Sequence, residues 1–317
     1  MTELIKYVKR DGRYELPRQR GQAKLGEILK WQTSGSRQKW PKHVANKSYP
    51  APPKQVEGKD MAATWIGHST VLIQTAGLNI LTDPFFSKRA SPTQLIGPAR
   101  VRPPGLALNN LPPIDVILLS HSHYDHMDKP ALKSLALKHK AKLITPLGNG
   151  HHAKGHDVKE LDWHETYTNG TLKVTALPAL HWSKRSLSDT NKSLWAAFMI
   201  ETESGNIYFG ADTGFGAGET FREAKRLFGP PRLSLLPIGA YEPRWFMAPQ
   251  HMNPQEAVMA HQLLGSKQSM AIHHGTVQLT DEAIDAPVAA LEQALGAAHL
   301  TREDFVVADI GQTVWIK

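Results

Sequence analysis

Short apolar runs and amphipathic segments alternate along the chain from residue 62 onward. Residues 62–86 predict two or three short strands with a glycine-containing turn, and Ile114–Ser120 is a nearly continuous apolar run, as in a buried strand. Apolar residues at helical spacing predict helices over 130–140, 218–228, 254–264 and 281–296, and further strands are expected at 142–145, 171–177, 194–201 and 206–210. Strands and helices that mix throughout predict a layered α/β fold.

The first 60 residues have a different pattern. They hold 14 Lys and Arg against 6 Asp and Glu, whereas residues 61–317 hold 23 of each. Residues 34–60 are polar and include four prolines, which predicts an extended connector. We therefore divide the chain into a basic arm with a proline-rich connector, residues 1–60, and one large domain, residues 61–317. Within that domain, the proline-rich stretch 84–113 predicts a lid or a binding loop.

The arm has two interpretations. It could wrap over the body of the protein, or it could make peripheral contact with an anionic membrane. For the membrane, its apolar side chains would supply the side that faces lipid: Tyr7, Tyr14, Leu16, Leu25, Ile28, Leu29 and Trp31. The rest of the chain has no basic excess, which argues against nucleic acid as a partner.

The composition excludes several classes of protein. The 317 residues include no Cys, so a disulfide framework, a thiolate zinc site and a cysteine nucleophile are all excluded. No run of 18 apolar residues predicts a membrane span, and the N-terminal residues lack the apolar stretch of a secretory signal. We therefore expect a cytoplasmic protein, with the arm as its one possible link to a membrane. The pattern predicts no particular oligomeric state.

Histidine and carboxylate side chains gather where one predicted strand ends. Five of them lie within eight residues directly after Ile114–Ser120: His121, His123, Asp125, His126 and Asp128. Imidazole and carboxylate are ligands that zinc prefers. Alternate residues of an extended segment point the same way, so His121 and His123 can bind one ion. A turn after them can bring Asp125 and His126 to a second ion.

Three later apolar strands each end in a further potential ligand. These residues are His181, Asp212 and His273. Strand ends that meet at one edge of a sheet are the usual place for a site in an α/β fold. We predict that the three join the first cluster and complete a site for two Zn²⁺ ions per chain. The same donors would accept Mn²⁺ or Fe²⁺.

The residues so far described, and the longer stretches around them, resemble the metallo-β-lactamase fold superfamily. More narrowly, they resemble N-acylphosphatidylethanolamine-hydrolysing phospholipase D and its bacterial relatives. The closer resemblance is carried by ATWIGHSTV (63–71), LPPIDVILLSHSHYDHMD (111–128), PALHWSKR (178–185), GADTGF (210–215), PIGAYEPRWFM (237–247) and SMAIHHGT (269–276), among others. It implies a four-layer αββα sandwich, with the metals at one edge between the two sheets.

The resemblance also implies a role for each ligand-type residue. The first zinc would be held by His121, His123 and His181. The second would be held by Asp125, His126 and His273, and Asp212 would bridge the two. Asp83 would orient a ligand imidazole from outside the metal shell.

Other matched positions concern the substrate. His251 would face it near the metals, where it could contact a phosphate or protonate the leaving oxygen, and Asp125 would also position the nucleophile. His68 would support the site or serve the fold alone. Arg244 is either a phosphate clamp or a partner in an internal ion pair. An apolar groove for an acyl chain could be lined by Tyr241, Trp245, Phe246 and Met247.

Two features depart from the family pattern. His274, directly after a ligand position, stands where the animal enzymes have Trp, and could alter the pocket or offer another ligand. The arm is poorly matched, which puts membrane binding in question.

The implied reaction is hydrolysis of a phosphodiester, that of an N-acylphosphatidylethanolamine-like phospholipid, by a hydroxide shared between two ions. Hydrolysis of a lactone or a phosphorylated sugar lactone at the same site is the alternative. A nuclease is disfavoured because residues 61–317 are neutral. A redox di-iron protein on this fold would replace a ligand histidine by Glu, whereas His121, His123 and His126 are all present. The intact ligand set also disfavours a non-catalytic scaffold.

Overall fold

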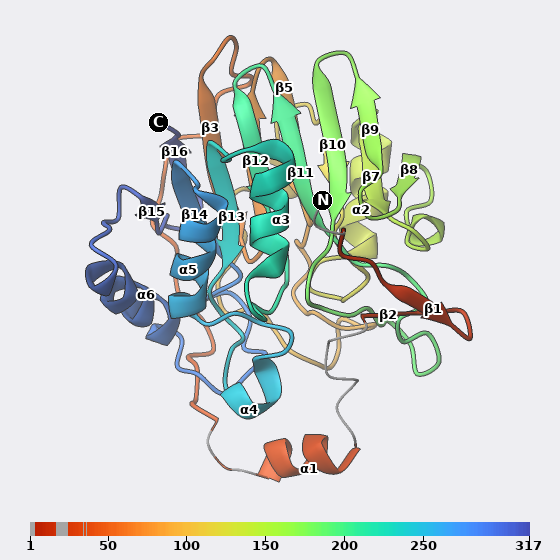
Figure 1. Ribbon diagram of the computed structural model, residues 1–317, viewed down its shortest axis with the longest axis vertical. Helices are drawn as coiled ribbons and strands as arrows, with labels where there is room; N and C mark the ends of the chain where they lie inside the picture. The colour runs from red at the N-terminus through yellow and green to blue at the C-terminus, as the bar shows by residue number, and fades with distance from the viewer. Residues whose placement is uncertain (1–3, 17–24, 34, 36) are drawn as a thin grey trace.

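The computed structural model describes residues 4–16, 25–33, 35 and 37–317. Two seven-stranded sheets are its centre (Figure 1). The first sheet has the order β15-β14-β13-β12-β11-β10-β9. Its strands are β9 (Thr166–Asn169), β10 (Leu172–Leu177), β11 (Ala197–Thr202), β12 (Gly205–Phe209), β13 (Leu233–Pro237), β14 (Gln268–Ile272) and β15 (Phe305–Val306). Strands β12 to β15 are parallel, and β9 to β12 are antiparallel.

The second sheet repeats this mixture of directions. Its order is β16-β3-β4-β5-β6-β7-β8. Its strands are β3 (Met61–Gly67), β4 (Thr70–Thr75), β5 (Leu78–Thr82), β6 (Val116–Leu118), β7 (Lys142–Pro146), β8 (Asp157–Leu161) and β16 (Thr313–Trp315). Strands β5 to β8 are parallel, and β16, β3, β4 and β5 are antiparallel. Every residue of β3 and β4 is buried, because both faces of the sheet are covered.

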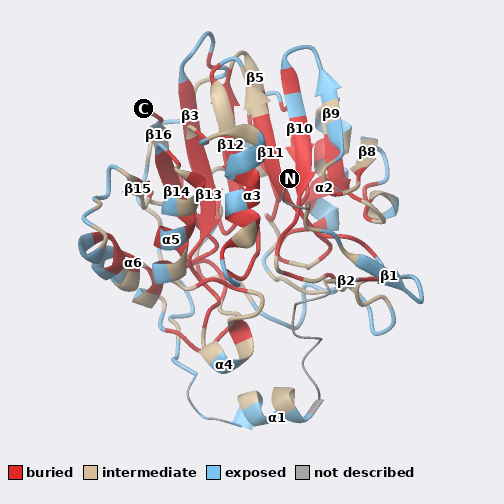
Figure 2. Cartoon of the chain, viewed as in Figure 1, coloured by how far each residue is buried: buried red, intermediate tan, exposed pale blue. Residues whose placement is uncertain are grey.

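Helices cover the outer faces of the two sheets. The covering helices are α2 (Lys129–Lys138), α3 (Glu219–Phe228), α5 (Pro254–Leu264) and α6 (Ala286–Ala297). Two others, α1 (Leu25–Thr33) and α4 (Arg244–Met247), lie beyond the sheets at one end of the molecule (Figure 1), and short 3₁₀ turns lie at Leu108–Asn110 and Gly150–His152. Leu132 and Leu135 of α2 are buried in a cluster with Ile117 and Leu143 of the second sheet. Helices α3 and α5 lie over the first sheet, and α5 also packs on α6 (Figure 1). The predicted αββα sandwich is therefore confirmed, and most of the apolar core lies between the sheets and under α3, α5 and α6 (Figure 2).

Two predicted elements begin later than expected. The strand expected at 194–201 begins at Ala197, because the backbone N–H of Leu194 and of Ala196 donate to Leu147 and Ser120 in the other half of the sandwich. The helix expected at 281–296 begins at Ala286. The carboxylate of Glu282 accepts a hydrogen bond from the N–H of Ala240, in the loop after β13. This contact holds residue 282 outside the helix, which therefore begins further along the chain.

The described part of the arm lies on the body of the protein. β1 (Val8–Arg10) and β2 (Arg13–Glu15) form a hairpin. Tyr14 is only 4% exposed, and the ring of Tyr7 lies 4.9 Å from that of Tyr14 and 5.4 Å from that of Trp163. The apolar side of the hairpin thus faces the core, and its outer side faces solvent (Figure 2). The arm residues 1–3 and 17–24, connector residues 34 and 36, and the side chain of Leu25 lie outside the described residues.

Residues 37–60 of the connector contain no helix or strand, in agreement with an extended segment, and they contact the large domain. Trp31 of α1 stacks on Phe246 of α4 with ring centroids 5.0 Å apart, and both helices lie at the same end of the molecule (Figure 1). The indole N–H of Trp40 donates to the Glu282 carbonyl, and Lys47 pairs with Asp309 at 2.8 Å. Among the described helices, none has the length and apolar character needed to cross a membrane.

Candidate metal centre

The predicted ligands follow strands that end at one edge of the sandwich. The loop 119–128 follows β6, and Asp83 follows the neighbouring parallel strand β5. In the other sheet His181 follows β10, Asp212 follows β12 and His273 follows β14. Strands of one direction bring their carboxyl ends to the same edge, which explains how side chains distant in sequence meet there.

Three imidazoles form the first group. Nε2 of His121 lies 2.9 Å from Nδ1 of His123, and Nε2 of His181 lies 3.2 Å from the same atom. Donor atoms of these three residues all lie within 4.8 Å of one another. Nitrogen atoms that converge in this way, with no carboxylate between them, have the arrangement of a metal-binding triad.

The second group combines imidazole with a carboxylate. Oδ2 of Asp125 lies 3.4 Å from Nε2 of His126 and 3.5 Å from Nε2 of His273. His68 joins this group, because its Nε2 is 2.8 Å from the same carboxylate oxygen. The sequence left open whether His68 supports the site. The structure places it in hydrogen-bond contact with Asp125.

Asp212 lies between the two groups. Its Oδ2 is 3.2 Å from Nε2 of His126 and 3.6 Å from Nε2 of His181. Its Oδ1 is 3.2 Å from Nε2 of His273. One carboxylate therefore faces donor atoms of both groups, which is the position that a bridging ligand requires.

The donor set fits divalent cations. Nε2 of His126, Nε2 of His273 and Oδ1 of Asp212 are buried, and although they face oppositely charged groups at 3.2–3.5 Å, none of them makes a hydrogen bond of good geometry. Leaving a polar atom buried and unpaired costs about 1–3 kcal/mol. A cation that accepts these lone pairs would remove that cost, so the residues present fit a metal that prefers nitrogen and oxygen.

The outward nitrogens of three of these imidazoles are held by other groups. Asp83 Oδ2 lies 2.6 Å from Nδ1 of His126, and Ser120 Oγ lies 2.8 Å from Nδ1 of His121. The Gln250 carbonyl oxygen lies 3.0 Å from Nδ1 of His181. Such partners fix the tautomer and the ring orientation of a metal-binding histidine, so each of these rings presents Nε2 to the centre.

Burial and neighbouring charges separate the histidines into two kinds. Burial lowers the pKa of His123 to about 3 and that of His181 to about 4. Burial also opposes a charge on His273, but Asp212 and Asp125 outweigh it and raise the pKa of His273 to about 9. His126 has its pKa raised well above the ordinary value by Asp212, Asp125 and Asp83 in the same way. The first group is therefore neutral, and in the second group the carboxylates favour the charged form of His126 and His273. His68 is the exception there, because burial lowers its pKa to about 3.

The backbone is strained at several of these positions. His68, Asp83 and His273 have φ values of 56°, 31° and 59°, in a region that residues with a side chain rarely adopt. Each such residue costs on the order of 1–3 kcal/mol and persists only where the surroundings impose it. All three residues line the candidate centre, as expected if the strained backbone directs their side chains toward it.

The residues predicted to face the substrate have different surroundings. The His251 ring lies 5.1 Å from that of His181 and 5.6 Å from that of His273, so His251 borders the centre. Arg244 forms the internal ion pair: both carboxylate oxygens of Glu256 accept from its Nη2, at 2.9 and 2.7 Å. Its Nη1 donates to the His251 carbonyl at 2.9 Å. The structure thus gives Arg244 a role in holding His251, and its guanidinium is engaged away from a phosphate.

Most of the residues predicted to line an acyl groove are covered, and His274 packs against a neighbouring ring. Tyr241 and Met247 are buried, Phe246 is covered by Trp31, and Trp245 is the one that remains 41% exposed. His274 stacks on Trp65 with centroids 4.6 Å apart, and it belongs to none of the potential ligand groups among the described residues. His274 therefore packs beside the centre instead of adding a ligand.

Sequence reasoning missed two residues at the centre. The ring of Trp182 lies 4.6 Å from that of His123, and Arg185 donates to two carbonyls of the loop 121–128. Both lie within the stretch PALHWSKR, directly after the ligand His181, which is the signal that could have found them.

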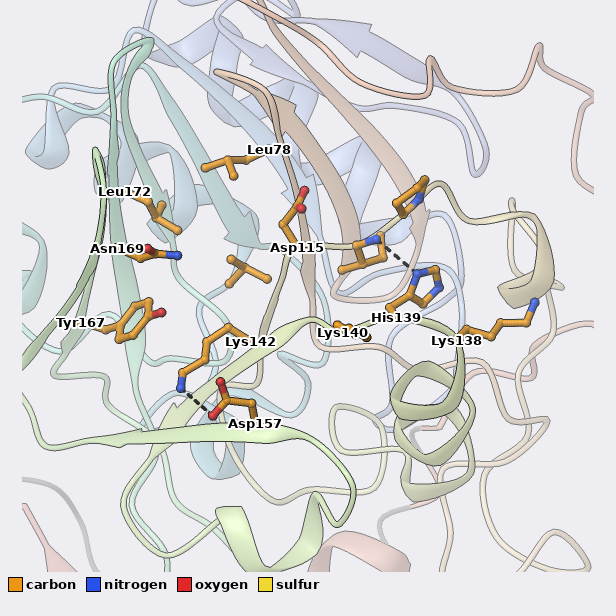
Figure 3. Close-up of a pocket in the computed structure, with 13 residues that line it drawn as sticks. Leu78, Asp115, Lys138, His139, Lys140, Lys142, Asp157, Tyr167, Asn169 and Leu172 are labelled. Atoms are coloured by element: carbon orange, nitrogen blue, oxygen red, sulfur yellow. Dashed lines mark hydrogen bonds and ion pairs between the residues drawn. The ribbon is translucent and has the colours of Figure 1, made fainter.

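A separate cavity of about 520 Å³ lies at the other end of the strands (Figure 3). It is lined by residues at the beginnings of β6, β7 and β10, among them Val116, Lys142 and Leu172, and Lys142 is paired with Asp157 at 2.7 Å. None of the candidate ligands lines it, so the chemistry considered below takes place at the opposite end of the sheets.

A two-sheet sandwich with histidines and aspartates converging at one edge defines the metallo-hydrolase class. Comparison with known proteins agrees with this. The model of the beta-lactamase superfamily domain matches residues 78–274. The chain is 41% identical over 268 residues to N-acyl-phosphatidylethanolamine-hydrolyzing phospholipase D 1 of Caenorhabditis elegans, covering 80% of this chain and 75% of that protein.

Two further proteins extend the comparison. The chain is 37% identical to the mitochondrial N-acyl-phosphatidylethanolamine-hydrolyzing phospholipase D of Saccharomyces cerevisiae, covering 72% of this chain and 50% of that protein. Igni18, a metallo hydrolase from Ignicoccus hospitalis, superposes with a TM-score of 0.60 at 21% identity, covering 81% of this chain and 99% of that one. The chain belongs to the beta-lactamase superfamily, and it is a metal-dependent hydrolase.

Proposed function

We propose that the protein is a binuclear zinc phosphodiesterase of the phospholipase D type, acting on an N-acylphosphatidylethanolamine-like phospholipid. The observation that carries the proposal is the carboxylate of Asp212, whose oxygens lie 3.2–3.6 Å from nitrogens of both groups. A shared carboxylate is what a two-ion site needs. The 41% identity to the Caenorhabditis elegans phospholipase supports the choice of a phospholipid.

The two groups would each hold one ion. The first would take His121, His123 and His181, the second would take Asp125, His126 and His273, and Asp212 would serve both. When bound, two divalent cations supply Lewis-acid polarisation of a phosphoryl oxygen and acidify water toward a pKa of about 7. Zinc suits the nitrogen-rich donor set, and Mn²⁺ or Fe²⁺ are compatible with it.

The remaining chemistry falls to the chain's own residues. In hydrolysis the oxygen of water adds to phosphorus, the bond from phosphorus to the alcohol oxygen breaks, and that leaving oxygen takes up a proton. His251 borders the centre, and burial lowers its pKa well below the ordinary value, so a neutral imidazole is available to hydrogen-bond the leaving oxygen. His68 holds Asp125 from behind at 2.8 Å, which keeps that carboxylate directed at the centre.

We also propose that the enzyme works in the cytoplasm and meets its lipid at an anionic membrane through the arm. Tyr7, Tyr14 and Leu16 pack against the core, so the proposal depends on α1, where Leu29 is 53% exposed. Lys30 of the same helix lies 5.0 Å from the Trp245 ring centre, which gives this end a cationic and an apolar component. Liposome flotation at low and high salt tests it: binding to anionic vesicles that weakens with salt is expected, and no binding at either salt would exclude it.

A substrate panel tests the reaction itself. Zinc-loaded protein would be offered N-acylphosphatidylethanolamine in vesicles, bis-p-nitrophenyl phosphate and a set of lactones, with Asp212→Ala as the matched control. We expect cleavage of both diesters, release of phosphatidic acid from the lipid, and no activity in the control. Turnover of lactones without diester cleavage would replace the proposal by its alternative, lactone hydrolysis at the same residues.

A further inference from the structure

A loop outside the ligand set, residues 183–193, holds the segment that carries three of the proposed ligands. Nη1 of Arg185 donates to the carbonyl oxygens of Ser122 at 2.9 Å and Met127 at 2.7 Å. The guanidinium lies 4.2 Å from the centre of the Tyr124 ring, and the Tyr124 hydroxyl donates back to the Arg185 carbonyl. One side chain therefore pins both ends of the segment between Ser122 and Met127, which contains His123, Asp125 and His126.

The loop 183–193 is itself held in shape by two short polar side chains. Asp189 Oδ1 accepts from the backbone N–H of Arg185 at 3.0 Å and of Ser186 at 2.7 Å. Asn191 donates its N–H to the Ser183 carbonyl at 2.8 Å and accepts the Ser183 N–H on its side chain at 3.1 Å. The backbone that presents Arg185 is thus fixed from residues 189 and 191.

The N-terminal hairpin β1–β2 forms hydrogen bonds with the outer side of this loop. The backbone N–H of Tyr14 donates to the Asn191 carbonyl at 2.8 Å. The Arg13 guanidinium donates to the carbonyls of Thr190 and Ser188. The hairpin is in turn anchored on the domain, because Tyr14 is buried and the Tyr7 hydroxyl donates to Asp162 at 2.9 Å.

These contacts form a continuous connection from the arm to the candidate centre. It runs from Arg13 and Tyr14 through residues 188–191 to Arg185, and from Arg185 to the two carbonyls that flank the ligand segment. The family domain matches residues 78–274, so the hairpin lies outside it. Of the side chains that made the arm look membrane-facing in the sequence, Tyr7, Tyr14 and Leu16 instead pack against the protein and support this connection.

We propose that the hairpin of residues 5–16 is an intramolecular brace, and that Arg185 is a positioning residue that transmits its effect to the segment 122–127. The inference goes beyond the reaction proposed above, and rests on that proposal only in taking His123, Asp125 and His126 as ligands. The two N–H groups of Nη1, a rigid fork in the plane of the guanidinium, fix the backbone, and the backbone sets where the three ligand side chains point. A donor pair on one rigid group suits this task better than a single ammonium.

The test compares variants of the full-length protein. Arg185→Ala removes the fork, and Arg13→Ala removes the grip of the hairpin. Arg10→Ala is the matched control, because Arg10 is exposed and pairs with Arg13 in the hairpin, while its side chain makes no hydrogen bond or ion pair with another described residue. Arg10→Ala and Arg13→Ala remove the same charge from the same hairpin, so an effect of charge alone would be equal in both.

Two readouts are measured for each variant. The first is amide hydrogen exchange over residues 121–128 in the metal-free protein, and the second is Zn²⁺ affinity by competition with a chelator. For Arg185→Ala we expect exchange in this segment to rise at least about tenfold and zinc affinity to fall about 10–100-fold, the range for residues that orient a metal ligand. Arg13→Ala should change both in the same direction by less, Arg185→Lys should recover only part of the loss, and Arg10→Ala should match the wild type.

Several results would overturn the proposal. They are unchanged exchange in the segment for Arg185→Ala, equal effects of Arg13→Ala and Arg10→Ala, or full recovery by Arg185→Lys, which would point to charge instead of the fork. If Arg185→Ala unfolds the whole domain, the comparison of Arg13→Ala with Arg10→Ala tests the proposal, because Arg13 is only half-buried. Hydrogen exchange is measured in the metal-free protein, so its result tests the role of the hairpin independently of the proposed zinc chemistry.

Discussion

Oδ2 of Asp83 lies 2.6 Å from Nδ1 of His126, and the opposite nitrogen of the same ring, Nε2, lies 3.2 Å from Oδ2 of Asp212. Asp83 is completely buried and also accepts from the hydroxyl and the backbone N–H of Ser120. One carboxylate therefore fixes the His126 ring and the start of the loop that leads to His121. The candidate centre depends on this residue although Asp83 need not contact an ion.

We expect Asp83→Ala to lower Zn²⁺ affinity by about 10–100-fold, because the His126 ring loses the partner that fixes its tautomer and orientation. Chelator competition measures the change. The control is Asp157→Ala, whose carboxylate is exposed and pairs only with Lys142 at 2.7 Å among the described residues. Equal zinc affinity in the two variants would contradict the orienting role.

Asp212→Ala should remove both ions, because the carboxylate faces nitrogens of both groups. The zinc content of the purified variant, measured by mass spectrometry after dialysis, is expected to fall for both sites together with activity. Loss of a single ion would mean that Asp212 serves one group only. Normal content and normal rate would refute the bridge.

Gly239→Ala should disturb His273, because a Cβ at residue 239 would collide with the His273 carbonyl oxygen. The ligand would have to move, and zinc affinity and turnover should both fall. Gly296→Ala in α6 is the control: a Cβ there meets nothing within 4 Å, and Ala favours a helix over Gly by at most about 1 kcal/mol. Urea unfolding should show Gly296→Ala at least as stable as the wild type, and a Gly239→Ala enzyme with unchanged zinc affinity would contradict the close approach.

His274→Phe should leave zinc content unchanged, because the ring of His274 is stacked on Trp65 and a phenyl ring can occupy the same space. His273→Phe, one residue earlier, should lose zinc because a proposed ligand is removed. Metal analysis of the pair separates a packing role from a ligand role. Loss of zinc in His274→Phe would assign His274 to the centre after all.

The contact of the connector with the domain should make stability depend on pH. Hydrogen bonds from Lys47 and Tyr49 hold the pKa of Asp309 below its ordinary value. A carboxyl with a depressed pKa in the folded state contributes stability above its unfolded pKa near 3.8 and loses it as pH falls through the folded pKa. Asp309→Asn should therefore destabilise the protein at pH 7, and the difference should shrink below about pH 3.8. Urea unfolding at both pH values measures it, and a pH-independent difference would contradict the ionic origin.

The ligand edge could be predicted from the sequence because it depends on local pattern. An apolar strand followed by His121, Asp212 or His273 places that residue at a strand end, and parallel strands bring their ends together. His68 could not be placed in the same way. Its contact with Asp125 joins residues 57 positions apart and depends on a positive φ at the turn between β3 and β4.

The structure of the arm was the part of the fold least predictable from the sequence. Its strands have three residues each, too few to display a period of two. Yet Asp11-Gly12 between them is a strong signal for a two-residue hairpin turn, and both residues have the positive φ values, 48° and 72°, that such a turn requires. The role of Arg185 depends on carbonyl acceptors in another loop, which no pattern of side chains encodes.

We infer that seven side chains at one edge of the sandwich hold two zinc ions. Anomalous X-ray diffraction from zinc-loaded crystals, collected on both sides of the zinc absorption edge, measures this directly. We expect two peaks: one among His121, His123 and His181, the other among Asp125, His126 and His273, with Asp212 in contact with both. A single peak, or peaks away from these residues, would contradict it.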